Sequence, residues 1–148
     1  MMRKFIFFAL IATSLLGFDI DDFDKGINEL NNGNLQKAYD IFSAGCEAKD
    51  ELSCEELGLM YINGEVSEQM DTSLQKRSNI DIGVEFVMKS CDLGYLNACS
   101  DIVDLKKDIG DKLAPGVYEN ALTRYDELAA EYKDSGDQNA TQAPAKNE

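Results

Sequence analysis

The sequence contains no histidine among its 148 residues. Without an imidazole there can be no Ser-His-Asp triad, no Cys-His nucleophile, no histidine general base and no histidine-bound zinc ion. The chain therefore lacks the side chain on which much hydrolytic and metal chemistry depends. We expect neither a cofactor nor a metal ion.

Basic residues are also scarce. The chain has 14 lysines and arginines against 28 aspartates and glutamates, which gives a net charge of -14. A chain of this charge is repelled by the phosphate backbone of nucleic acid and by anionic lipid. The expected partner is instead a protein or a peptide.

A long apolar run is missing as well. The apolar segment FIFFALIATSLLGF has fourteen residues, whereas a membrane-spanning helix needs about 20. Because it follows the basic start MMRK, we interpret residues 1–17 as a signal peptide that is cleaved after Gly17. An uncleaved anchor stays the alternative, since Leu15 is a poor residue three positions before the cut. The residue directly after Gly17 is Phe18 and not a cysteine, which argues against a lipoprotein. We therefore expect a periplasmic or secreted protein without stable membrane insertion after cleavage.

What the chain does have is helical periodicity, most clearly in residues 34–64. The apolar positions before a polar break are Leu35, Ala38, Tyr39 and Phe42, and those after it are Cys54, Leu57, Gly58 and Tyr61. This spacing places them on one face of each of two helices. The pattern predicts an αα-hairpin, and a second copy is expected at residues 80–109. Two copies of such a unit predict an all-α fold built as a short solenoid of hairpins.

The four cysteines form two C-x7-C pairs, and each cysteine of the second pair lies 45 residues after its counterpart. In an exported chain four cysteines are expected to form disulfide bonds. A zinc site is the rival explanation, but C-x7-C is not a zinc spacing. Four cysteines allow three pairings, and the repeat favours Cys46 with Cys54 and Cys91 with Cys99. Each of these disulfide bonds is expected to stabilise the fold by about 2 to 3 kcal/mol.

The segments around the hairpins are interpreted as follows. Acidic residues before a short apolar pattern indicate the start of an N-terminal helix, with a calcium site as the alternative; they are Asp19, Asp21, Asp22 and Asp24. The polar insert 65–79 is interpreted as slack between the hairpins, with a binding loop as the alternative. Residues 116–133 form the expected capping helix, whose tyrosines belong either to its core face or to a ligand-facing stripe: Tyr118, Tyr125 and Tyr132.

The tail 134–148 is expected to be disordered and to carry a glycosylation acceptor at Asn139 in DQNAT.

One family has a similar frame. The pattern A-x3-F-x3-C-x7-C-x2-LG-x-MY-x-NG, which starts at Ala38 and ends at Gly64, resembles the Sel1-like repeat in the disulfide-bearing, TPR-like form of the Helicobacter cysteine-rich proteins. The resemblance covers roughly residues 34–109. The second copy keeps KSCDLGYLNAC but has Val103 and Lys106 where the first has Gly58 and Tyr61. The cysteine pairs are also spaced more widely than is usual in that family.

The resemblance implies a possible interaction with β-lactams or with peptidoglycan peptides, because similar proteins carry β-lactamase assignments. The chain contains an S-x-x-K motif at Ser73 and Lys76 and a Y-x-N motif at Tyr118 to Asn120, but no K-T-G. Ser73 and Lys76 are thus candidate catalytic residues. Glu55 and Glu56 are a second hydrolytic candidate, although carboxylates on an exposed helix face are usually only solvated.

A binding scaffold is the competing and preferred interpretation. Stacked helical hairpins present a concave surface that accepts extended peptides without any reaction. The first helix of each hairpin is expected to line it, with Asn34, Lys37, Glu85 and Lys89 as candidate contacts. We therefore expect a scaffold that binds a protein or peptide, including one derived from peptidoglycan, with β-lactam binding or weak hydrolysis as the alternative. A secreted antigen without a small ligand would have the same sequence features.

Overall fold

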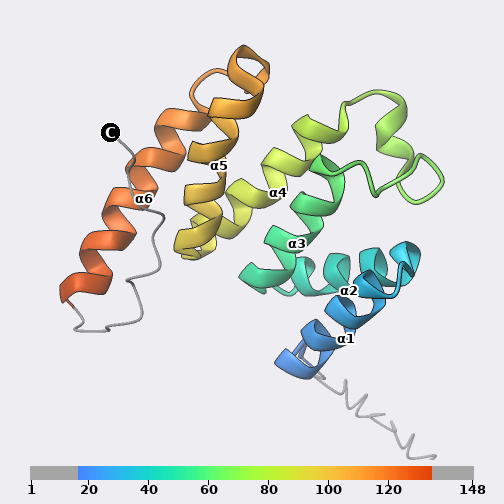
Figure 1. The fold of residues 1–148 in the computed structure, drawn as a ribbon. Coiled ribbons are helices and arrows are strands. Elements are labelled where there is room, and N and C mark those ends of the chain that lie inside the picture. Colours follow the sequence, from blue (N-terminus) through green and yellow to red (C-terminus); the bar gives the residue numbers. More distant parts are fainter. Residues whose placement is uncertain (1–16, 135–148) are drawn as a thin grey trace, which may run out of the picture.

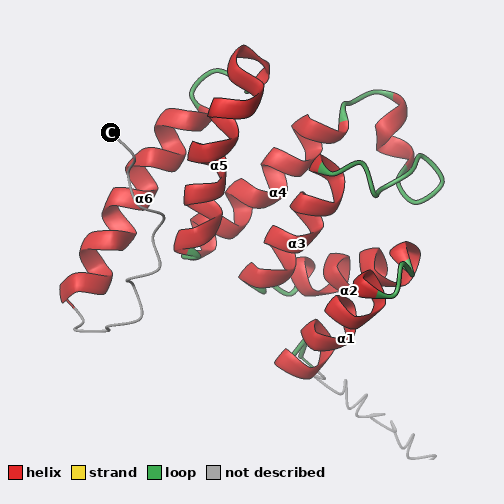
Figure 2. Ribbon diagram, in the orientation of Figure 1, coloured by secondary structure: helices red, strands yellow, loops and turns green. Residues whose placement is uncertain are grey.

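The computed structural model describes residues 17–134. The predicted signal peptide up to residue 16, the glycosylation acceptor Asn139 and the predicted disordered tail beyond residue 134 lie outside this range. The described residues form helices and loops without a strand, which confirms the predicted all-α class (Figure 2). None of the described helices is both long and apolar enough to cross a bilayer.

Six α-helices and two short 3-10 helices follow one another along the described chain. The α-helices are α1 (Ile20–Asn31), α2 (Leu35–Glu47), α3 (Glu51–Ile62), α4 (Asn79–Leu93), α5 (Leu96–Ile109) and α6 (Val117–Asp134), and the 3-10 helices are η1 (Thr72–Gln75) and η2 (Gly110–Lys112). Each α-helix packs against its neighbours in sequence, so that α1 and α6 lie at opposite ends of the stack (Figure 1). Helix α4 also contacts α6, the second helix after it.

Helix starts are fixed by side chains that accept hydrogen bonds from free backbone N-H groups. Asp19 accepts from the amide of Asp22 at the start of α1, Asp50 from that of Ser53 in α3, and Ser78 from that of Asp81 in α4. At the other end, α4 stops at Gly94, whose φ of 110° is one that glycine adopts without a steric cost. Short caps of this kind allow the chain to reverse within a few residues.

The disulfide bonds close the turns of two hairpins. Cys46 pairs with Cys54 between α2 and α3, and Cys91 pairs with Cys99 between α4 and α5, as predicted. The two Cα atoms of the first pair lie 4.5 Å apart, and those of the second pair lie 4.8 Å apart. Four pairs of positions separated by 45 residues are buried in both hairpins, with every member at most 2% exposed: Phe42 and Val87, Cys46 and Cys91, Cys54 and Cys99, Leu57 and Ile102. The two hairpins are therefore repeat-like in sequence and in burial.

The two hairpins join through α3 and α4, which make the most extensive helix contact of the described chain. Gly58 and Gly83 face each other in this contact. A Cβ on Gly58 would lie 2.7 Å from the Gly83 carbonyl oxygen, and one on Gly83 would lie 2.6 Å from the Gly58 carbonyl oxygen. The helices can approach this closely because neither residue has a side chain.

Two polar side chains of α4 also fasten it to the first hairpin. The Lys89 ammonium donates a hydrogen bond to the Cys46 carbonyl over 2.8 Å, and the Ser90 hydroxyl donates to the Glu51 carbonyl over 2.7 Å. Both carbonyls lie beside the turn that the first disulfide closes. These bonds fix the second hairpin on the turn of the first.

The connection between α3 and α4 is attached to the core, so the interpretation of residues 65–79 as slack is wrong. Val66 is 3% exposed, and Met70 and Leu74 pack against the core that surrounds Phe42. The Tyr61 hydroxyl donates to the Asp71 carboxylate over 2.5 Å. The sequence contained a signal for this packing, because the apolar residues Val66, Met70 and Leu74 are spaced four apart within an otherwise polar segment.

Candidate functional site

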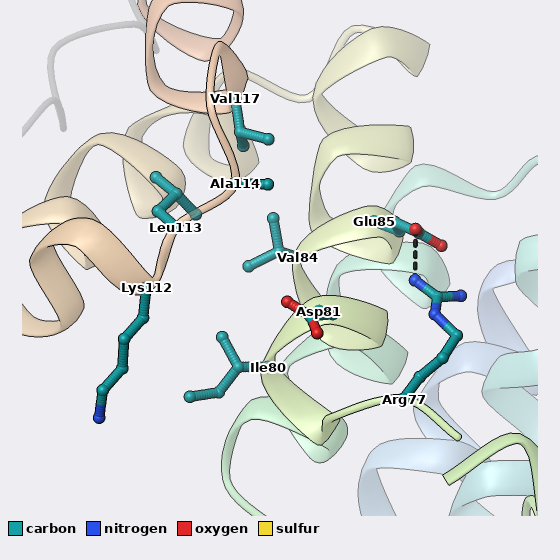
Figure 3. A pocket seen from close by; sticks show the side chains of 9 residues that line it. All are labelled: Arg77, Ile80, Asp81, Val84, Glu85, Lys112, Leu113, Ala114 and Val117. Carbon is teal, nitrogen blue, oxygen red and sulfur yellow. Dashed lines mark hydrogen bonds and ion pairs between the residues drawn. The ribbon is translucent and has the colours of Figure 1, made fainter. Parts of the chain in front are cut away.

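A pocket of about 280 Å³ opens between the first turns of α4 and the segment that leads into α6 (Figure 3). In Figure 3, Ile80 and Val84 of α4 face the segment of η2 and α6 across this space. The pocket thus joins two elements that are separated by the whole of α5. Its lining residues are Arg77, Ile80, Asp81, Val84, Glu85, Lys112, Leu113, Ala114 and Val117.

The apolar side of the pocket follows from helical spacing. Ile80 and Val84 are four residues apart, so they lie one turn apart on the same face of α4. Leu113 is 6% exposed and belongs to the C-terminal core, which Val117 also contacts. The floor can therefore accept an apolar side chain.

The rim carries charges of both signs. Arg77 forms an ion pair with Glu85, and Asp81 lies near enough to add a further attraction to the guanidinium. Lys112 stands on the other side and makes no ion pair with a described residue (Figure 3). The site therefore combines an apolar floor with a mixed-charge rim and includes one ammonium available to a ligand.

Of the four residues predicted to line a concave surface, only Glu85 lies at the pocket. The Asn34 side chain donates to Glu29 over 2.6 Å, and the Lys37 ammonium lies 3.6 Å from the same carboxylate. Both contacts join α2 to α1. Lys89 is bonded to the Cys46 carbonyl. These three residues act in helix packing in the structure, for which the sequence offered no signal.

The predicted pair of Ser73 and Lys76 does not form a nucleophile and its base in the structure. The Ser73 hydroxyl donates to the Asp71 carboxylate over 2.6 Å, and none of the described hydrogen bonds joins it to the Lys76 ammonium. Burial raises the pKa of Asp71, but hydrogen bonds from Ser73 and Tyr61 outweigh this effect and lower it overall. A carboxylate with a lowered pKa is a poor general base. Tyr118, from the Y-x-N motif, packs into the C-terminal core.

We expect Ser73→Ala to leave unchanged any β-lactam hydrolysis that the protein shows, because the Ser73 hydroxyl is hydrogen-bonded to the Asp71 carboxylate, which is a poor general base. The measurement is nitrocefin turnover by the purified, oxidised protein and by the variant at matched concentrations. Thr123→Ala is a matched control, since Thr123 is another hydroxyl residue with a local hydrogen bond. Turnover that disappears with Ser73→Ala but persists in the control would contradict the geometry.

The other hydrolytic candidate, Glu55, was expected on an exposed face, and this is wrong. Glu55, on α3, is only 8% exposed. Burial and the charge of Asp101 raise the pKa of Glu55 to about 8. Burial likewise raises the pKa of Asp101 and that of the neighbouring Glu56.

The remaining candidates are structural in the described residues. Tyr118, Tyr125 and Tyr132 are half-buried and pack against the C-terminal core. Asp19 caps α1 and Asp22 pairs with Lys25, and the described residues include no group of three or more acidic, cysteine or histidine side chains placed to hold a metal ion. The sequence had not marked Ile80, Val84, Leu113 and Val117 as a site, since each also fits a core position.

Similarity to known proteins does not identify this site. No protein-family model, no curated protein and no solved structure matches the chain. The function must therefore be argued from the pocket, the helix stack and the charges that surround them.

Proposed function

We propose that this chain is a short Sel1-like scaffold that binds an extended peptide or protein segment at the pocket between α4 and α6. The pocket is the observation that carries the proposal. It is open, it is apolar at its floor, and its lining comes from the first turns of α4 with the residue Arg77 before them and from the segment that runs from η2 into α6. Stacks of helical hairpins bind extended chains through surfaces of this kind.

The lining indicates the chemistry of the ligand. Ile80, Val84 and Leu113 favour an apolar anchor side chain, which would gain free energy by leaving water. Lys112 offers an ammonium to a carboxylate or a backbone carbonyl of the bound segment. The ligand is therefore a peptide with one apolar anchor next to an acidic residue or a free carboxyl group, and peptides derived from peptidoglycan belong to this class.

The proposed setting is the periplasm or the cell exterior. Both disulfide bonds lie in turns of the described chain, and disulfide bonds persist in oxidising compartments. A relation to Sel1-like repeats is supported by the cysteine frame and by the four buried pairs of positions 45 residues apart.

Ala114→Trp is expected to weaken peptide binding at least tenfold, which corresponds to about 1.4 kcal/mol. Ala114 lines the pocket and is exposed, so an indole there would fill the mouth without entering the core. The probes are linear heptapeptides enriched from a displayed library against the oxidised protein, together with soluble muropeptides. Their affinities are measured by fluorescence anisotropy of labelled peptides and by calorimetry for muropeptides.

The matched control is Ala130→Trp, which places the same side chain on an exposed position of α6 outside the pocket. It should bind like the unsubstituted protein. The proposal is wrong if no probe binds, or if both tryptophan variants bind with unchanged affinity.

A further inference from the structure

The turn that leads into α4 is closed by the Asp71 carboxylate. This carboxylate accepts hydrogen bonds from the Ser73 amide over 2.8 Å, from the Ser73 hydroxyl over 2.6 Å and from the Tyr61 hydroxyl over 2.5 Å. Tyr61 belongs to α3 and is 1% exposed, and its ring stacks on Phe86 of α4 with the ring centroids 5.6 Å apart. One carboxylate therefore ties the turn to the buried contact of α3 and α4.

The same turn carries Arg77 to the rim of the pocket. The backbone amide of Arg77 donates to the Ser73 carbonyl over 3.2 Å, so the bonds between Ser73 and Asp71 also fix the backbone from which the Arg77 side chain starts. At its other end the guanidinium pairs with Glu85 of α4 (Figure 3). A long side chain loses rotational freedom when its tip is held, and a fixed backbone reduces that cost. The turn therefore favours the position of the guanidinium at the pocket.

The place of Arg77 decides the charge that a ligand meets at this side of the pocket. Asp81 and Glu85 lie one turn apart on α4, and both line the pocket. With the guanidinium beside them the two carboxylates are balanced by an opposite charge, whereas without it they would repel an acidic ligand. The Arg77 side chain is 40% exposed and a guanidinium has five N–H donors. Arg77 can therefore pair with Glu85 and still donate to a carboxylate of the ligand.

We propose that Arg77 determines the preference of the pocket for acidic peptides and that Asp71 is the positioning residue that holds Arg77 at the rim. Asp71 does not line the pocket, so it acts through the turn, and its role rests on the proposed function. The hydrogen bonds of Asp71 to Ser73 and Tyr61 thereby connect the buried face of α3 with the recognition of a ligand charge.

The test measures the binding of matched peptide pairs to the full oxidised protein and its variants by fluorescence anisotropy. One member of each pair is a heptapeptide enriched from the displayed library that contains aspartate or glutamate, and the other carries the corresponding amide residue; both ends of each peptide are blocked. The unsubstituted protein should bind the acidic member at least about fivefold more tightly. Asp71→Ala and Arg77→Gln should each lower this ratio to about two or less, because the guanidinium is misplaced in the first variant and absent in the second.

Net charge alone predicts the opposite result for Asp71→Ala, since the loss of a negative charge strengthens the binding of an acidic peptide. Glu68→Ala is the matched control, because it removes the same charge from an exposed position of the same connection and should keep or raise the ratio. Asp71→Asn retains a side-chain oxygen for the Ser73 amide, so it should keep most of the preference. A loosened fold would weaken both members of a peptide pair alike and leave their ratio unchanged.

A second measurement needs no ligand. NMR relaxation of the Arg77 Nε–Hε group reports how firmly the guanidinium is held, and its order parameter should fall in Asp71→Ala but not in Glu68→Ala. An unchanged order parameter in Asp71→Ala overturns the positioning role, and so does a full acidic preference in Asp71→Ala or Arg77→Gln, or enrichment of neutral peptides alone. If instead no probe binds, or Ala114→Trp binds with unchanged affinity, the proposed function fails and the role of Arg77 falls with it.

Discussion

Reducing both disulfide bonds is expected to lower the free energy of unfolding by about 5 kcal/mol. Each bond closes a short loop, since its cysteines are 8 residues apart, and a loop of this length restricts the unfolded chain by about 2.5 kcal/mol. All four cysteines are at most 1% exposed, so the bonds also lie in well-packed surroundings. A domain of this size has a total stability of about 5 to 15 kcal/mol, so the loss is a large share of it.

The measurement is urea denaturation followed by circular dichroism, for the oxidised protein and for protein that was reduced in denaturant and refolded with reductant. The double variants Cys46→Ala with Cys54→Ala and Cys91→Ala with Cys99→Ala separate the two bonds, and each should give about half of the effect. Identical urea midpoints before and after reduction, with free thiols verified by alkylation, would show that the core holds the hairpins without the bonds.

The second large effect is expected at the α3–α4 contact, where Gly58→Ala should cost about 2 kcal/mol. The added methyl would lie 2.6 Å from the Val87 side chain and 2.7 Å from the Gly83 carbonyl oxygen. A side chain can rotate away, but the Gly83 carbonyl belongs to the backbone of α4 and can move only with the helix. The gain of about 1 kcal/mol that alanine brings to an unobstructed helix is smaller than this cost.

Gly83→Ala meets the same contact from the other helix and should destabilise the protein to a similar degree. Asp126→Ala, at an exposed position of α6, is the control and should change stability by less than about 0.5 kcal/mol. Urea midpoints of the three variants are compared with that of the unsubstituted protein. A Gly58→Ala protein as stable as the original would mean that α3 and α4 do not approach as closely as described.

The hairpins could be predicted from the sequence because the information is local. Phe42 and Cys46 repeat one helical turn apart, and Cys54 follows after a short polar turn. A chain that folds back at this turn brings the two sulfur atoms together, and the repeat of the spacing favoured this pairing over the other two. The same logic applies 45 residues later, where the second pair of cysteines marks the second hairpin.

The sites could not be predicted because they depend on contacts between distant helices. Val84 and Val117 line one pocket although α5 separates them in sequence, and the burial of Glu55 depends on how the other helices pack around α3. No local pattern distinguishes Glu55 from an exposed glutamate. The hydrogen bond between Tyr61 of α3 and Asp71 could not be predicted for the same reason, although the spacing of Val66, Met70 and Leu74 was a local signal that this loop packs on the core.

The placement of the disulfide bonds divides the described chain into two covalent halves. Both bonds lie within hairpins, and residues 63–78 between α3 and α4 are crossed by neither. A single peptide-bond cleavage in that connection would therefore leave two chains with no covalent bond between them. Such a nicked protein would be a heterodimer held by the glycine contact of α3 and α4 and by the hydrogen bonds of Lys89 and Ser90, so its affinity of association would report directly on the strength of the boundary between the two hairpins.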